Sequence, residues 1–170
     1  MSVIAVEELA KNKVGGLIVF EREVKIKDII DTGIKMNCDV SPQVLVNIFV
    51  PNTPLHDGAI IVRNDRIVSA TCYLPLSDNM DISKELGTRH RAAIGMSEVS
   101  DALVIAVSEE TGMVSIAQGG QLTRGITEKE LRDKLKELQN KKSETTLVGK
   151  WKGRLKHEST SQKYSGLKNV

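Results

Sequence analysis

The chain has 170 residues, which suits one domain or one domain followed by a tail. Hydrophobic residues make up 40% of it and aromatic residues only 3%, so an aliphatic core can form but the aromatic platform on which single-stranded nucleic acids stack is missing. We therefore expect no nucleic-acid partner. The net charge of +2 hides an asymmetry, because residues 1–126 hold 12 basic and 16 acidic residues, whereas residues 127–170 hold 12 and 6.

Two features bear on the cellular compartment. Cys38 and Cys72 lie far apart and form no C-x-x-C pair, so the sequence indicates two reduced thiols in a cytosolic protein and no zinc site or disulfide framework. No run of about 18 apolar residues is present, and Glu7 and Glu8 stand where a signal peptide would be apolar. This chain is expected to be soluble, alone or as part of a longer protein.

The first half of the chain alternates short helices and strands. Gly15 and Gly16 end a segment with helical apolar spacing. Ser41 and Pro42 have the residue types of an N-cap and a first helical position. In chain order the patterns predict a helix over 3–13, a buried strand over 17–20, an ambiguous segment over 26–30, a helix over 41–49, and a hairpin of strands 59–63 and 66–73 with its turn at 64–65.

The second half of the body continues the alternation. Thr88 is the expected N-cap of a helix, and a continuous apolar run after that helix predicts a strand near the centre of a sheet. The patterns predict a loop over 75–84, a helix over 88–99, and strands over 102–107 and 113–117. Intermixed helices, strands and hairpins indicate an α/β fold with a mixed sheet flanked by helices.

The basic end of the chain differs from the body. Thr127 and Glu130 form a capping box, and the apolar stripe after it predicts a C-terminal helix over 127–142. Residues 143–170 are rich in Lys, Ser, Thr and Gly and are expected to form a flexible, disordered tail. Its charge suits an anionic membrane surface or an acidic partner. A merely solvated tail is the favoured interpretation, because no amphipathic anchor accompanies the charge.

The segment Pro54-Leu55-His56-Asp57-Gly58-Ala59 is the first candidate for chemistry. It lies in a loop before a predicted strand, where glycine lets a ligand approach the main chain. The Asp57 carboxylate can bind a metal ion or accept a hydroxyl proton. An ordinary Asp-Gly hairpin turn is the alternative.

The second candidate is the predicted helix start Gly87-Thr88-Arg89-His90-Arg91. Free amides, a hydroxyl and a guanidinium at a helix N-terminus suit a phosphate group. Residues two apart point to different sides of a helix, so Arg89 and Arg91 are not expected to grip one phosphate. A solvated basic helix start is disfavoured, because basic residues at this end cost free energy without an anion.

Other signals are weaker or missing. Ser108-Glu109-Glu110-Thr111 follows the most apolar strand, a place where ligands gather in open α/β sheets, although a polar turn fits equally well. The sequence lacks a P-loop, a dinucleotide-binding glycine motif and a nucleophile elbow. His56-Asp57 alone does not indicate an HD-type phosphohydrolase, which needs more His and Asp ligands.

Together these segments carry a family resemblance. PLHDGA, TCYLPLS, GTRHRAAIG and VSEETG closely resemble the diadenylate cyclase catalytic domain, whose hallmarks DGA and RHR are intact here. The resemblance covers about residues 3–126, so we assign the catalytic domain to 1–126. The opening LAKNKVGGLIVFE is most similar to the membrane-anchored type of Gram-positive bacteria. That type implies a location at the cytoplasmic face of the cell membrane for the full-length protein.

The resemblance implies an activity and a set of roles. The family condenses two ATP molecules to cyclic di-AMP and releases two pyrophosphates; a non-catalytic ATP or cyclic di-AMP binding module is the alternative. Asp57 and Arg89 would be catalytic, with Asp57 activating the 3′-hydroxyl and Arg89 holding phosphates. His56 and Asp57 would hold a divalent metal, Mn²⁺ or Mg²⁺, with Co²⁺ as a further candidate. Substrate-binding residues would be Gly58, Ala59, Tyr73, Leu74, Thr88, Arg89, Ser108 and Glu109.

The same resemblance implies partners. A ring with two equivalent bonds needs two facing sites, so a homodimer is expected for catalysis. The anchored type further implies a regulatory membrane protein and a phosphosugar mutase. The roles of His90, Arg91 and Glu109 stay open, and His90 and Arg91 are structural or intersubunit candidates.

Overall fold

The computed structural model describes residues 2–79 and 86–140. The chain divides into two compact units, Met1–Glu128 and Lys129–Val170, and each is described by itself. In the second unit the described residues belong to a helix over 128–140. The predicted tail over 143–170 and part of the loop predicted over 75–84 lie outside the described residues.

The first unit contains four labelled helices and seven strands. They follow one another as α1 (Ser2–Lys11), β1 (Gly16–Phe20), α2 (Lys27–Ile30), β2 (Ile34–Asp39), α3 (Pro42–Ile48), β3 (Ala59–Arg63), β4 (Arg66–Cys72), α4 (Thr88–Val99), β5 (Leu103–Val107), β6 (Val114–Gln118) and β7 (Gln121–Arg124). The predicted α/β class with a mixed sheet is confirmed.

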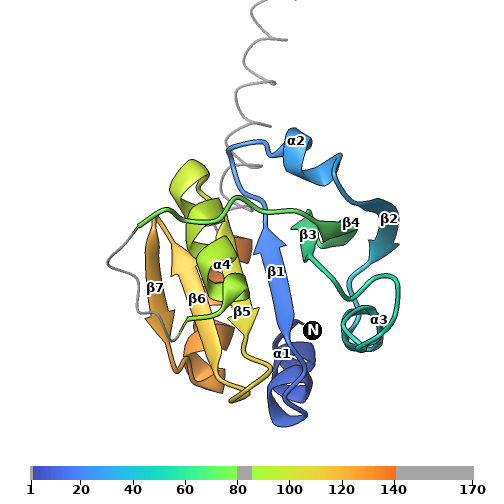
Figure 1. Cartoon of the computed structure of the whole chain (residues 1–170), viewed down its shortest axis with the longest axis vertical. Coiled ribbons are helices and arrows are strands. Elements are labelled where there is room, and N and C mark those ends of the chain that lie inside the picture. Colours follow the sequence, from blue (N-terminus) through green and yellow to red (C-terminus); the bar gives the residue numbers. More distant parts are fainter. Residues whose placement is uncertain (1, 80–85, 141–170) are drawn as a thin grey trace, which may run out of the picture. The chain divides into compact units, whose positions relative to one another are not determined.

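One sheet carries all seven strands, in the order β2-β4-β3-β1-β5-β6-β7 (Figure 1). β1 lies in the middle; it runs parallel to β3 and antiparallel to β5. The remaining neighbours are antiparallel, as the hairpins require. The central position of β1 places its first residues next to the ends of two other strands.

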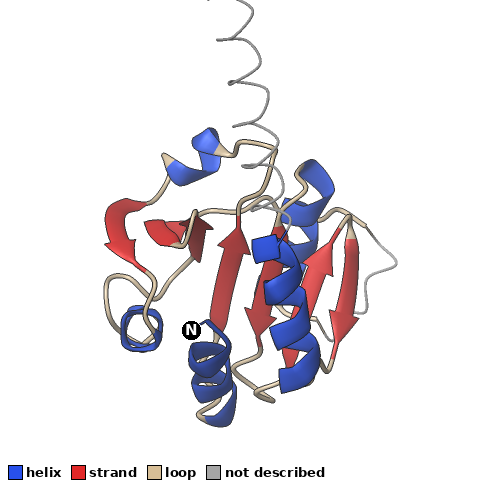
Figure 2. Ribbon diagram, turned by 180° about the vertical axis from the view of Figure 1, so that it is seen from behind, coloured by secondary structure: helices blue, strands red, loops and turns tan. Residues whose placement is uncertain are grey.

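Helices cover the two faces of this sheet. Alternate residues of β1, Leu17 and Val19, belong to the same buried cluster as Ala93 and Met96 of α4. Figure 1 shows α4 in front of β5 and β6. α1 and α3 pack against each other and lie at the end of the sheet where β1 begins, as the view from behind shows (Figure 2).

Several local predictions are confirmed at the level of single bonds. The Ser41 hydroxyl accepts the Val44 N–H at 3.2 Å, as an N-cap should. Asn64 and Asp65 have φ of 50° and 59°, the left-handed pair that a two-residue hairpin turn requires.

One prediction is wrong, and the set of predicted strands is incomplete. Thr88 is not the N-cap of α4: Gly87 has the extended backbone of a cap, with ψ of 176°, and Thr88 is already helical. β2 and β7 were not predicted. Both are edge strands whose side chains are mostly half-exposed or exposed, so they lack the buried apolar pattern that marks β1 and β5.

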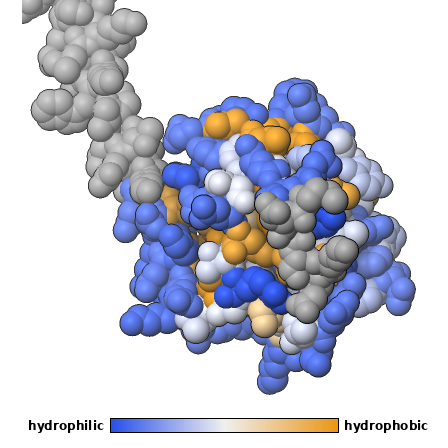
Figure 3. Space-filling view, turned by 60° about the vertical axis from the view of Figure 1, so that its left-hand side comes forward, coloured by the Kyte–Doolittle hydropathy of each residue, from blue (hydrophilic) through white to orange (hydrophobic). Residues whose placement is uncertain are grey.

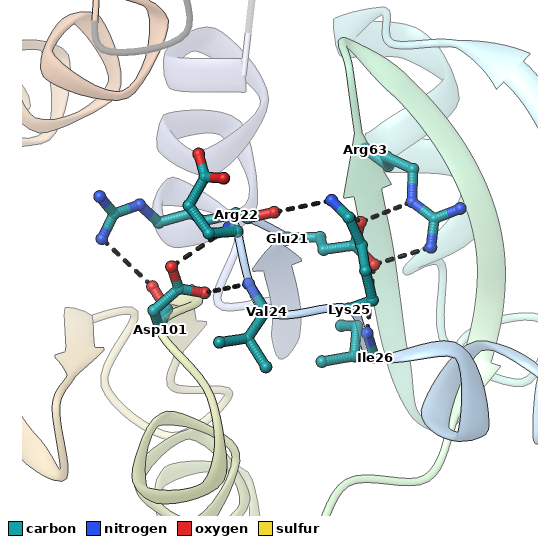
Figure 4. A network of polar contacts seen from close by, with 8 residues as sticks. Glu21, Arg22, Val24, Lys25, Ile26, Arg63 and Asp101 are labelled. Atoms are coloured by element: carbon teal, nitrogen blue, oxygen red, sulfur yellow. Dashed lines mark hydrogen bonds and ion pairs between the residues drawn. The ribbon is translucent and has the colours of Figure 1, made fainter. Parts of the chain in front are cut away.

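A polar network fixes the loop between β1 and α2 (Figure 4). The buried carboxylate of Glu21 accepts bonds from Arg63 Nε at 2.6 Å and Nη2 at 2.7 Å, and from the Ile26 N–H at 3.3 Å. Burial alone would raise the pKa of Glu21, but these bonds outweigh it and lower that pKa. The Asp101 carboxylate accepts the backbone N–H groups of Glu23 and Val24 at 3.1 Å, so the middle of the loop is held as well as its ends.

The face shown in Figure 3 is mainly hydrophilic, with apolar areas lying between the hydrophilic side chains. Among the described residues, no helix is both long and apolar enough to cross a bilayer.

Candidate functional site

The ends of three strands meet at Gly15 and Gly16. In the parallel pair Ile18 lies opposite Ile60, so the loop that leads into β3 lies at the end of the sheet where β1 begins. On the other side of β1, Gly16 lies opposite Val107, the last residue of β5. Neighbouring strands are about 4.8 Å apart. The loop with Asp57 and the turn after β5 therefore flank the same two glycines.

The start of α4 reaches this point through Arg89. The guanidinium of Arg89 lies directly against Gly15. Its Nη1 forms an ion pair with Glu109 Oε2 at 2.7 Å, and the Arg89 side chain keeps 28% of its surface exposed. The structure thus brings together two predicted substrate-binding residues, Arg89 and Glu109, and leaves the cation accessible to an anion.

Gly58 directly precedes β3, in a conformation that glycine adopts with little cost. Its φ is +122°, and a Cβ there would lie 2.7 Å from the Thr71 carbonyl carbon and 3.0 Å from the Cys72 oxygen. Ala59, fully buried, pairs with Cys72. The alternative of an Asp-Gly hairpin turn is wrong, because the hairpin turn is at residues 64–65 and Gly58 packs on the end of β4 instead.

His56 and Asp57 have the chemistry of a partial metal site. His56 Nδ1 lies 2.7 Å from the Thr53 carbonyl oxygen, and a proton on Nδ1 would leave Nε2 free as a ligand. Asp57 is exposed. The described residues contain no group of three or more metal-binding side chains. Two protein ligands fit an ion such as Mg²⁺ that shares its coordination with substrate phosphates and water.

Tyr73 and Leu74 follow β4 directly and so lie beyond the strand that pairs with Ala59. Tyr73 is 69% exposed, and its backbone N–H donates to the Thr32 hydroxyl at 3.0 Å. Thr32 in turn donates to the Ile29 carbonyl at 2.7 Å, which ties this segment to the end of α2. Leu74 packs against the buried cluster under α4. An exposed aromatic ring on a fixed backbone is suited to stacking on a base.

The first turn of α4 directs Arg89 and Arg91 to different partners, as its helical spacing predicted. Thr88 is exposed beside Arg89. Arg91 points elsewhere: its Nη2 donates to the Ser77 carbonyl at 2.8 Å, and its own carbonyl accepts the Ser77 N–H at 3.0 Å. Arg91 is therefore structural within the described chain, because it fastens the segment after β4 to α4.

His90 is the buried member of this turn, with 9% of its surface exposed. Burial lowers the pKa of His90, and the positive charges of Arg124 and Arg89 lower it further, whereas Glu110 acts in the opposite direction. A neutral imidazole is therefore favoured, so His90 adds no further charge to those of Arg89 and Glu109.

The turn after β5 presents Ser108 and Glu109. The Ser108 hydroxyl accepts the Thr111 N–H at 3.3 Å, and the Gly112 N–H donates to the Ser108 carbonyl at 2.9 Å. This closed turn holds Glu109 in the solvent, where its partner is Arg89. The polar-turn interpretation is confirmed by these bonds, and the ligand-site interpretation stays a prediction.

Sequence reasoning missed three residues at this site. Gly15 was taken as a helix breaker, although its neighbour is Arg89. Thr32, far from the motifs in sequence, anchors Tyr73. Thr71 has φ of +60°, which is uncommon for a β-branched residue, at the close contact with Gly58. For these three residues, the only signal in the sequence is the double glycine at 15–16, which marks Gly15.

Comparison with known proteins decides the family. The family model described as DisA bacterial checkpoint controller nucleotide-binding (DAC) matches residues 3–122. The chain belongs to this family. It is 52% identical over 147 residues to "Cyclic di-AMP synthase CdaA" of Bacillus subtilis, an alignment that covers 86% of this chain and 54% of the relative. A "Diadenylate cyclase" of Listeria monocytogenes is equally similar, with 85% and 54% covered.

Solved structures agree with this DAC assignment. A crystal structure of a DacA double mutant from Staphylococcus aureus matches with a TM-score of 0.79 and 50% identity, over 81% of this chain and 91% of that one. A hypothetical membrane spanning protein from Bacillus cereus matches with a TM-score of 0.70 and 48% identity, over 72% and 60%. The chain spans about half the length of the curated relatives it matches.

Proposed function

We propose that this DAC domain is a nucleotidyltransferase that condenses two ATP molecules to cyclic di-AMP. The observation that carries the proposal is the convergence of the DGA loop, the RHR helix start and the turn after β5 on Gly15 and Gly16. The names of relatives at 52% identity support the same activity. A non-catalytic ATP or cyclic di-AMP binding module is the competing hypothesis.

The reaction is an in-line displacement at phosphorus. The 3′-hydroxyl of one ATP attacks the α-phosphorus of the other, an O3′–Pα bond forms, the bond from Pα to the bridging oxygen breaks, and pyrophosphate leaves. Asp57 accepts the hydroxyl proton. The second bond forms in the same way with the two nucleotides exchanged. Each chain holds one ATP, so two chains must face each other across a twofold axis.

The remaining site residues bind and orient the nucleotide. Arg89 and the Thr88 hydroxyl hold phosphate oxygens, together with Ser108, and Glu109 orients Arg89. Gly58 and Ala59 let the main chain approach the nucleotide. Tyr73 and Leu74 lie by the adenine, with the Tyr73 backbone fixed by Thr32.

His56 and Asp57 would hold the divalent ion, with Mn²⁺, Mg²⁺ and Co²⁺ as candidates. When bound, such an ion offsets negative charge on the phosphates and on the departing pyrophosphate. For the full-length protein we propose a location at the cytoplasmic face of the membrane, with a regulatory membrane protein and a phosphosugar mutase as partners.

A single substitution tests the enzyme hypothesis. The chain is incubated with ATP and Mn²⁺, and products are identified by mass spectrometry. Wild type should form cyclic di-AMP and pyrophosphate, whereas Asp57→Asn should lose the product by a factor of about 10² or more and still bind ATP. Asp65→Asn, the same change at an exposed turn residue, is the matched control and should keep full activity.

The outcomes separate the hypotheses. ATP binding without pyrophosphate release by wild type would favour the binding module. Normal turnover by Asp57→Asn would refute the role of Asp57. Deletion of residues 143–170 should leave the activity intact. Loss of activity would show that these residues contribute to catalysis.

A further inference from the structure

The two glycines before β1 meet different neighbours. A Cβ on Gly16 would approach Leu9 Cδ1 at 3.1 Å and the ring of Phe49 at 3.6 Å, which are side chains of the helical layer formed by α1 and α3. A Cβ on Gly15 would lie 2.6 Å from Arg89 Cζ, 2.8 Å from Nη1 and 3.0 Å from Nε. Gly16 is thus explained by packing, whereas the three atoms nearest to a Cβ on Gly15 all belong to the guanidinium of a proposed substrate-binding residue.

The contact at Gly15 leaves no room for a Cβ while the Arg89 guanidinium stays in place. Protein atoms do not approach a Cβ within 3.0 Å, so even the methyl group of alanine would displace the three guanidinium atoms. The displaced group is the end of a flexible side chain, and Gly15 does not have a positive φ. An alanine at this position can therefore be accommodated by the fold, but only if Arg89 moves.

We propose that Gly15 is a positioning residue: its bare main chain forms a seat for the Arg89 guanidinium. This inference rests on the proposed function, because it assigns Arg89 to the phosphates of the nucleotide. The seat holds the guanidinium on one side and Glu109 holds it on another. Fewer rotamers remain available to Arg89, so less conformational entropy is lost when a phosphate binds.

The position of the seat gives it a role in the reaction. Gly16 lies opposite Val107, so Gly15 lies next to the turn that begins at Ser108. The loop with Asp57 leads into β3, the strand parallel to β1, and so lies at the end of the sheet where β1 begins. A guanidinium held at Gly15 is therefore at the same end of the sheet as the proposed proton acceptor and the proposed phosphate-binding turn. Moving the Arg89 guanidinium would take its positive charge away from the phosphate that the hydroxyl attacks. Small displacements of catalytic groups reduce rates strongly.

A double-mutant cycle tests the seat. ATP affinity is measured by calorimetry for wild type, Gly15→Ala, Arg89→Ala and the double variant, and cyclic di-AMP formation is measured in parallel. Arg89→Ala should weaken ATP binding roughly tenfold, the size expected for a charged hydrogen bond. Gly15→Ala should weaken it several-fold. The double variant should bind like Arg89→Ala, because Gly15 acts through Arg89.

Three results would overturn the proposal. Gly15→Ala with wild-type affinity and turnover would show that no seat is needed. Full additivity in the double variant would show that Gly15 acts independently of Arg89. Thermal melting reports whether Gly15→Ala folds. If it does not fold, hydrogen exchange of the Arg89 Nε–H is measured on wild type, with the resonance assigned by its loss in Arg89→Lys. This proton should exchange slowly with water, and fast exchange would contradict a guanidinium held against Gly15.

The proposed activity and the seat fail in different ways. Wild-type protein that binds ATP with this pattern of affinities but yields no cyclic di-AMP would refute the activity and leave the seat intact. A wild type that forms cyclic di-AMP, together with a Gly15→Ala variant of unchanged affinity and turnover, would refute the seat and leave the activity intact.

Discussion

The Gly58→Ala substitution tests whether the DGA loop depends on the main chain of Gly58. The structure opposes the new methyl group in two ways. The φ of +122° belongs to a region that residues with a Cβ rarely adopt, and the nearest atoms are main-chain atoms of Thr71 and Cys72 at 2.7–3.0 Å. Main-chain atoms within a paired strand cannot rotate away as a side chain can.

The expected cost adds two contributions. Backbone strain at such a φ is about 1–3 kcal/mol, and overpacking against fixed atoms is about 1–3 kcal/mol. We take roughly 4 kcal/mol as the centre, which is a large part of the 5–15 kcal/mol that stabilises a typical domain. For a unit of this size the melting temperature should fall by about 10–20 °C. If β3 and β4 separate to relieve the clash, stability falls less, but Asp57 then moves relative to Tyr73.

Two measurements on the same protein distinguish these outcomes. Thermal unfolding followed by circular dichroism gives the loss of stability, and calorimetry gives ATP affinity. Gly87→Ala is a matched control for packing, because a Cβ on Gly87 meets nothing within 4 Å; since Gly87 is the N-cap of α4, the change should cost about 1 kcal/mol or less, well below the cost at Gly58. A Gly58→Ala protein that keeps both the wild-type melting temperature and wild-type ATP affinity would refute the reasoning.

Three further expectations follow from particular contacts. Arg63→Met should destabilise the chain by roughly 2–3 kcal/mol in thermal unfolding, because it leaves the buried Glu21 carboxylate without its main partner; Arg66→Met, which breaks an exposed pair, should cost about 0–1 kcal/mol, and equal losses would contradict the argument. The Glu21–Arg63 contribution should be fully present above pH 4.5, the ordinary pKa of Glu21, and be lost as the pH falls through the lowered pKa of the folded state, so acid titrations of wild type and Arg63→Met should converge. Thr32→Val should weaken ATP binding by about threefold to tenfold in calorimetry, because the Tyr73 N–H loses its acceptor, and unchanged affinity would show that Thr32 does not position Tyr73.

Local chemistry accounts for the elements that could be predicted. The Ser41 cap, the left-handed pair Asn64–Asp65 and the uniformly buried β5 each depend on residues that are neighbours in the chain. β2 could not be found in this way. Its side chains are half-exposed and its pairing with β4 is interrupted by a register shift between Lys35 and Cys38, so no clean alternation is present.

The candidate site shows the same division. Asp57, Gly58 and Arg89 were identified because their residue types are unusual for their surroundings. Their mutual arrangement could not be predicted, because it arises from strand pairing between residues more than 40 positions apart in the chain. Gly15 is the clearest case: no local pattern says which side chain needs the space above a glycine.

The helix start with its two arginines links these observations to mechanism. Helical spacing alone predicted that Arg89 and Arg91 diverge, and the structure gives each a separate partner, Glu109 and the Ser77 carbonyl. His90 lies between them, buried and favoured in its neutral form. The Arg91 guanidinium fastens the chain and the Arg89 guanidinium stays accessible, so in the proposed site only Arg89 of these two would contact a phosphate. For Arg89 and Arg91 to exchange partners, α4 would have to rotate, and such a rotation would expose the buried His90.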